Sequence, residues 1–169
     1  YFGNWKALHY MAQDVFKPIM ISLTKKENNT FQLWAVSDTE SFSDTLIVRI
    51  IKLNGDLVSV KKQAVQINVG AKHILTLPFC KEDEFIICSL QQKQVQSKIG
   101  FTKAIKHYDF PKPNIQYQYI DNQLKLSTDV PAFQLYLHGI KGKFSDNFFP
   151  LLPGEKKIIE IKALEFNPN

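Results

Sequence analysis

The chain has 169 residues, of which 44% are hydrophobic and 22% charged, and it contains two cysteines. It is too short for a (β/α)₈ barrel, which takes about 250 residues; it has too few cysteines for a disulfide scaffold, and no run approaches the roughly 20 apolar residues that span a membrane. The net charge of +5 arises entirely before residue 107, from scattered lysines with a single arginine, Arg49, and this pattern argues against a nucleic-acid partner.

Residues 4–16 are predicted to form an α-helix. Apolar side chains recur at helical spacing, at Trp5, Leu8, Ala12 and Val15. Asn4 is suited to cap the first turn, because its side chain can accept from free backbone amides. Pro18 ends the helix, because proline disfavours helical backbone at the residue before it.

Everything after this helix is predicted to be β-strand, since β-branched and aromatic runs alternate with turn residues about every 8–12 positions. Asn54-Gly55 lies between two such runs and is a strong hairpin signal. The strands expected before residue 108 are 19–24, 31–37, 45–53, 57–60, 64–69, 73–79, 84–90 and 98–105. This spacing predicts a β-sandwich.

A domain boundary is predicted at the connector that contains Pro111 and Pro113, because two prolines so close together resist pairing in a sheet. Further strands are expected over 115–120, 124–127, 132–138 and 157–162. The predicted organisation is therefore a helix in 1–17, a first immunoglobulin-like sandwich in 18–107 and a smaller one in 108–169. The fold class is mostly β.

No catalytic or metal-binding set stands out. The four histidines are scattered, no cysteine pair has zinc spacing, and the acid-rich segment 38–44 lacks the glycine of a calcium loop. No Gly-x-Ser-x-Gly nucleophile motif occurs. Cys80 and Cys88 lie in apolar strands, where thiols are usually inert. We therefore expect no metal, no cofactor and no catalytic residue in this chain.

Aromatic side chains are the one feature that could bind a ligand. Most should fill the cores. Tyr117 and Tyr119, however, stand two residues apart and so share one face of a strand, with Gln116 and Gln118 on the other face. They are the candidates for a platform that stacks against a sugar ring.

Two segments carry a family resemblance. Residues 3–10 read Gly-Asn-Trp-Lys-Ala-Leu-His-Tyr, and residues 144–155 read Phe-Ser-Asp-Asn-Phe-Phe-Pro-Leu-Leu-Pro-Gly-Glu. The first resembles the helix that closes the catalytic barrel of β-mannosidases of glycoside hydrolase family two. The second resembles a signature of their C-terminal immunoglobulin-like domain. The matching residues, which we interpret as structural, are Trp5, His9, Tyr10, Asp146, Asn147, Phe148, Phe149, Pro153, Gly154 and Glu155.

The resemblance implies a parent enzyme that removes terminal β-D-mannose from the non-reducing ends of β-mannosides. A retaining mechanism would use two glutamates of the barrel. No glutamate of this chain matches either motif, so we expect both to lie upstream of Tyr1. The absence of an initiator methionine fits a piece of a longer polypeptide. The chain alone should then be no enzyme, and its partner would be the upstream barrel.

The hypothesis is thus a non-catalytic accessory fragment of a β-mannosidase, whose sugar ligands are β-mannosides. The alternatives are a carbohydrate-binding module and a cell-surface interaction module that has no catalytic partner. A periplasmic or extracellular location is the expectation for a bacterial parent, and neither nucleic acid nor membrane is expected as a partner.

Overall fold

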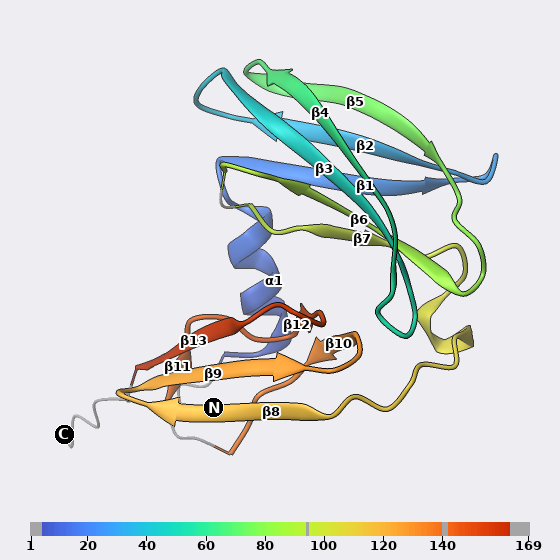
Figure 1. Cartoon of the computed structure of the whole chain (residues 1–169). Coiled ribbons are helices and arrows are strands. Elements are labelled where there is room, and N and C mark those ends of the chain that lie inside the picture. The colour runs from blue at the N-terminus through green and yellow to red at the C-terminus, as the bar shows by residue number, and fades with distance from the viewer. Residues whose placement is uncertain (1–4, 94, 140–141, 163–169) are drawn as a thin grey trace. The chain divides into compact units, whose positions relative to one another are not determined.

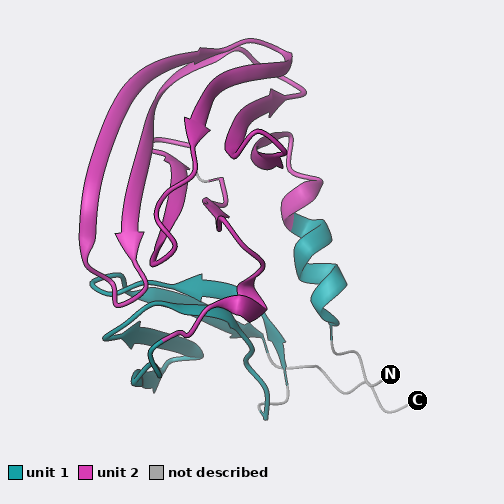
Figure 2. Ribbon diagram, turned by 90° about the vertical axis from the view of Figure 1, so that its right-hand side faces the viewer, with its two compact units in different colours: residues 1–13, 111–169 teal, residues 14–110 magenta. Residues whose placement is uncertain are grey.

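The computed structural model describes residues 5–93, 95–139 and 142–162. The chain divides into two compact units, one of residues 14–110 and the other of residues 1–13 and 111–169 (Figure 2). Within the described residues the secondary structure is mostly β-strand with one α-helix at the start, which confirms the predicted fold class. The domain boundaries placed at 17/18 and 107/108 stay predictions.

The unit of residues 14–110 is built from two antiparallel sheets (Figure 1). One has the order β1-β2-β5, with β1 Ile19–Lys26, β2 Thr30–Ser37 and β5 Gly70–Pro78. The other has the order β4-β3-β6-β7, with β4 Leu57–Ile67, β3 Phe42–Lys52, β6 Glu84–Leu90 and β7 Lys98–Gly100. A short 3₁₀ helix, η1 Ile105–His107, follows.

The core of this unit follows from strand alternation. In β2 the side chains of Phe31, Leu33 and Ala35 are buried, while those between them are partly exposed. β6 is buried on both faces, because Ile86 and Cys88 join the core of the sandwich while Phe85, on the other face, contacts the Phe101 ring at 5.6 Å. Gly100 must be glycine, because a Cβ there would lie 2.7 Å from the Ile86 side chain.

In the structure, two predicted strands of this unit merge into one and a third is much shorter. Segments 57–60 and 64–69 form the single strand β4, because its pairing with β3 continues without a break through residues 61–63. Segment 98–105 is a strand only over β7, which pairs with just three residues of β6. The hairpin at Asn54-Gly55 is confirmed, and Gly55 has a φ of 99°.

The other unit also has two antiparallel sheets. The larger has the order β11-β13-β9-β8, with β11 Lys143–Phe144, β13 Lys157–Lys162, β9 Gln123–Thr128 and β8 Ile115–Ile120. The smaller pairs β10 Ala132–Leu135 with β12 Phe149–Leu151. β11 and β12 are too short to show a strand pattern in the sequence, and β10 ends three residues earlier than predicted.

Helix α1, Ala7–Val15, contributes residues 7–13 to this second unit. Tyr10 is its one buried residue, and the Tyr10 ring joins the core formed by β9, β12 and β13. Leu8 and Met11 point away from that core and are exposed. The helix is shorter than the predicted span of 4–16, and Asn4 lies outside the described residues.

Candidate functional site

The two motif segments, more than 130 residues apart in sequence, meet in the unit that contains β8–β13. The Tyr10 ring lies edge-on to Trp5 at 5.4 Å and contacts the Phe148 ring at 6.2 Å between centroids. Trp5 also lies beneath the ammonium of Lys143, which is 3.6 Å from the ring centroid. Such a cation–π contact adds about 0.5–2 kcal/mol. The motifs therefore form one structural cluster.

Asn147 is the polar centre of this cluster. Its Oδ1 accepts from the backbone N–H of Leu137 at 2.8 Å and from that of Phe148 at 3.0 Å. Its Nδ2 donates to the Leu137 carbonyl at 3.0 Å. The side chain is 5% exposed, so it acts as a buried clamp that holds the segment after β10 in the way a strand partner would.

Neighbouring motif residues support the clamp. Asp146 accepts from the Asn147 N–H and pairs with Lys157 at 2.6 Å. Phe148 has a φ of 60°, which is unusual for a bulky side chain and costs about 1–3 kcal/mol. Phe149 is 2% exposed and lies in the core. The four consecutive motif residues 146–149 thus supply, in order, an ion pair, the clamp, a strained aromatic residue and a core ring.

Burial raises the pKa of Tyr10 above its ordinary value. Hydrogen bonds to the Phe144 backbone and the Asn147 side chain oppose this shift without cancelling it. The hydroxyl therefore stays protonated at neutral pH. It serves to tie α1 to the clamp.

The remaining motif residues have simpler roles. Gly154 has a φ of 77°, in the turn where the N–H of Glu155 donates to the Leu152 carbonyl at 3.1 Å. Pro153 precedes that turn. His9 is exposed, and its Nδ1 accepts from the N–H of Lys6 at 3.2 Å. None of them is among the lining residues of the two pockets described below.

A pocket of about 170 Å³ opens beside the clamp. It is formed where α1 and the segments that flank β11 come together. Among the described residues that line it there is no carboxylate, the group that glycoside hydrolysis ordinarily uses in pairs. The lining residues are Trp5, Tyr10, Tyr136, Leu137, His138, Gly139, Gly142, Phe144 and Asn147.

Two rings that line this pocket, Tyr136 and His138, take part in a stack. Tyr136 lies nearly parallel to Phe148, at 4.8 Å and 20°, and nearly parallel to His138, at 5.5 Å and 23°. Tyr136 is nevertheless 56% exposed, and His138 is exposed as well. No pattern in the sequence predicted this stacking, because Phe148 lies ten or more residues further along the chain than Tyr136 and His138.

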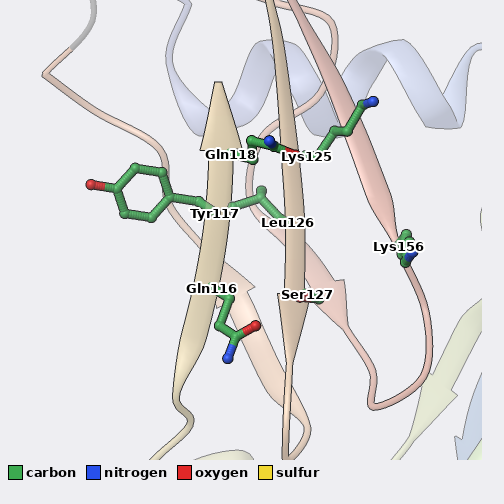
Figure 3. Close-up of a pocket in the computed structure, with 7 residues that line it drawn as sticks. All are labelled: Gln116, Tyr117, Gln118, Lys125, Leu126, Ser127 and Lys156. Atoms are coloured by element: carbon green, nitrogen blue, oxygen red, sulfur yellow. The ribbon is translucent and has the colours of Figure 1, made fainter. Parts of the chain in front are cut away.

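Tyr117 and Tyr119 share a face of the edge strand β8, opposite Leu126 and Leu124 of β9. They are 76% and 50% exposed, and the Tyr119 hydroxyl donates to Asn122 at 3.0 Å. A shallow pocket of about 330 Å³ lies on this sheet, and in Figure 3 the Tyr117 ring points away from the sheet. Sugar stacking by the two tyrosines stays a prediction. The pocket is lined by Gln116, Tyr117, Gln118, Lys125, Leu126, Ser127 and Lys156.

Metal sites, reactive thiols and membrane-spanning helices are three other kinds of functional feature. Within the described ranges, no three His, Cys, Asp or Glu side chains cluster in a way that could hold a metal ion. Burial raises the pKa of Cys80 to about 11 and that of Cys88 to about 12, and both thiols are free. Among the residues that the structure describes, no helix is long and apolar enough to span a membrane.

Asp44, in the acid-rich segment, is held by backbone amides. Burial alone would raise its pKa, but hydrogen bonds from the amides of Lys93, Gln92, Thr45 and Gln91 outweigh burial and lower it. The donor–acceptor distances range from 2.6 to 3.3 Å. The Asp44 carboxylate therefore holds residues 91–93, the loop that follows β6, in place.

Comparison with known proteins agrees with this architecture. A family model described as an Ig-fold domain, Ig_mannosidase, matches residues 110–168. The chain is 27% identical over 199 residues to β-mannosidase A of Neosartorya fischeri, and 28% identical over 200 residues to that of Aspergillus oryzae. These alignments cover 99% of the chain and 21% and 22% of the two relatives. The chain thus spans about a fifth of their length.

Two solved structures share the fold. The β-D-mannosidase of Dictyoglomus thermophilum superposes with a TM-score of 0.78 at 20% identity, over 92% of this chain and 21% of that one. The exo-chitosanase CsxA of Amycolatopsis orientalis superposes with a TM-score of 0.58 at 14% identity, over 89% of this chain and 24% of that one.

The fold and the sheet orders define a protein with two immunoglobulin-like β-sandwich units after an N-terminal helix. Over nearly its whole length, this chain matches the C-terminal, immunoglobulin-like part of β-mannosidases. The resemblance seen in the two motifs is thereby confirmed.

Proposed function

We propose that this chain is the non-catalytic accessory region of a β-mannosidase that removes terminal β-D-mannose from non-reducing ends. The observation that carries the proposal is the match to β-mannosidases over 99% of the chain, combined with a site cluster that lacks paired carboxylates. The role of the region is to hold the end of the catalytic barrel through α1.

The exposed side of α1 supports this role. Leu8, Met11 and Val15 recur at helical spacing and are 73%, 53% and 53% exposed. Burying each of them would contribute about 1.5–3 kcal/mol. Tyr10, on the other side, is already anchored by the cluster. A helix anchored on one side and apolar on the other is suited to join a sandwich to a barrel.

The test uses the product of the complete gene and this chain, with p-nitrophenyl β-D-mannoside as substrate. The complete product should release p-nitrophenol, whereas this chain should release none. Turnover that scales with the concentration of this chain would overturn the accessory role. A complete product that cleaves β-glucosaminides but no β-mannosides would overturn the proposal that β-mannosides are its substrate.

The helix role is tested separately in the complete product. Leu8→Asp and Val15→Asp place charges in the proposed contact. Each should lower the temperature at which the complete product loses its catalytic activity. The matched control is Val69→Asp, since Val69 is 59% exposed and belongs to the turn between β4 and β5 rather than to α1. Equal effects of all three substitutions would show that α1 makes no such contact.

A further inference from the structure

The pocket beside Asn147 has the dimensions of a site for one ring. Its volume is about 170 Å³, and a cavity of about 150 Å³ is enough to hold benzene. The ligand would therefore be a single six-membered ring, with any longer chain extending into solvent.

The aromatic wall of this pocket is fixed in place before any ligand arrives. Phe148 has strained backbone, and its ring is stacked under Tyr136 at 4.8 Å. The Asn147 clamp holds the backbone on both sides, at Leu137 and Phe148. Strain of this kind persists where surrounding structure over-determines it, and it clusters at ligand sites.

The rim of the pocket is polar. Within the described residues, neither the Tyr136 hydroxyl nor the His138 ring makes a hydrogen bond to another side chain or to the backbone. The Lys143 ammonium lies over Trp5, and no acid lines the pocket. A matching ligand would be neutral, with an apolar face for the rings and hydroxyls around its edge.

A hexopyranose has this chemistry, because its axial C–H groups form an apolar face and its hydroxyls project around the ring. We propose that the pocket of Trp5, Tyr136 and His138 binds the pyranose ring of a neutral β-mannoside or of the mannose released from it. The choice of mannose among hexoses rests on the proposed function. The pocket contains no hydrolytic groups, so it binds sugar without cleaving it.

The experiment is an NMR titration of the ¹⁵N-labelled chain with methyl β-D-mannopyranoside. A hexose has about twelve heavy atoms, and at ordinary ligand efficiency these correspond to a Kd of about 2 mM. The Trp5 indole and the amides of His138 and Gly142 should shift together. An absence of shifts at about 50 mM would overturn the proposal.

Variants locate the site. Tyr136→Ala and His138→Ala should each weaken binding by at least about tenfold, as expected when a stacked ring is lost. Tyr136→Phe keeps the ring, so it should retain more affinity than Tyr136→Ala. If Tyr136→Phe binds while Tyr136→Ala does not, the lost binding follows from the lost ring. The matched control is Tyr117→Ala, which removes an exposed tyrosine from β8 and should leave the Kd unchanged. Loss of binding in Tyr117→Ala alone would move the site to the predicted platform.

Two further outcomes separate this proposal from the accessory role. Stronger binding of adenosine than of the mannoside would identify the pocket as a nucleobase site and overturn the sugar assignment, while leaving the hydrolysis assay unaffected. Binding of methyl β-D-glucopyranoside but not of the mannoside would support a hexose pocket and refute mannose. Neither result depends on whether the complete gene product cleaves β-mannosides.

Discussion

Replacing Asn147 by alanine removes all three clamp hydrogen bonds. The Phe148 N–H keeps a bond to the Leu135 carbonyl at 2.9 Å, so the loss falls on the N–H and the carbonyl of Leu137. An unsatisfied buried backbone group costs about 1–3 kcal/mol. Leu137 is half-buried, so water replaces part of the loss, and we expect Asn147→Ala to lower the free energy of unfolding by about 2–4 kcal/mol.

The assay is urea unfolding followed by tryptophan fluorescence. The chain has two tryptophans, and Trp34 belongs to the unit of residues 14–110. A Trp34→Phe background therefore leaves Trp5, beside Tyr10, as the reporter of the clamp. The urea midpoint should fall by at least about 1 M. Asn114→Ala is the control, since Asn114 is exposed in the same unit.

Asn147→Asp refines the test, because it keeps an acceptor for the Leu137 N–H but places an oxygen against the Leu137 carbonyl. The amides of Leu137 and Phe148 favour the carboxylate, whereas burial and the repulsion from the Leu137 carbonyl favour the neutral acid; we expect the latter two to prevail and to raise the pKa of the new carboxyl above its unfolded value of about 3.9. A raised native pKa gives stability that is complete below pH 4 and is lost as the pH rises through that pKa. Equal midpoints for Asn147→Ala and Asn114→Ala would refute the clamp.

Three other substitutions or reactions test the remaining structure. Phe149→Ala empties a core position that is 2% exposed and should cost about 3–5 kcal/mol in the same titration; an unchanged midpoint would contradict its burial. Asp44→Ala strips the amides of residues 91–93 and should cost about 3–5 kcal/mol at pH 7. Because the native pKa of Asp44 is lowered, this cost should shrink as the pH falls below about 4; a constant cost would refute the amide contacts. With pKa values of about 11 and 12, Cys80 and Cys88 should resist iodoacetamide at pH 8 until urea unfolds the chain, and rapid labelling of the native chain would show exposed thiolates.

The parts of the fold that could be predicted are those governed by local pattern. Strands β2, β3 and β6 were expected to within three residues at each end, because alternation of apolar side chains is a local property. Asn54-Gly55 predicted its hairpin for the same reason, since the positive φ of Gly55 suits that turn. Where local pattern was weak, as at the two-residue strand β11, the prediction missed the element.

The candidate site could be predicted only in part. The motif residues were found, and Phe149 proved to be buried as a core ring. Tyr136 and His138 were not selected, because a ring that stacks on a distant segment has the same sequence signature as a ring in a core. Asp44 was considered as part of an ion site, whereas its partners are the amides of residues 91–93, almost fifty positions away.

By itself, the sequence determined the mostly-β class, the leading helix and the two family motifs, since composition, periodicity and motif spacing are carried by neighbouring residues. Only the tertiary structure decided that Tyr10 of α1 packs against Asn147 and Phe148, and that a ring-sized pocket opens beside them. The physical reason is that these contacts join segments more than 120 residues apart. Which faces meet across such a distance depends on how the sheets pair and pack, and neighbouring residues in the chain do not encode it.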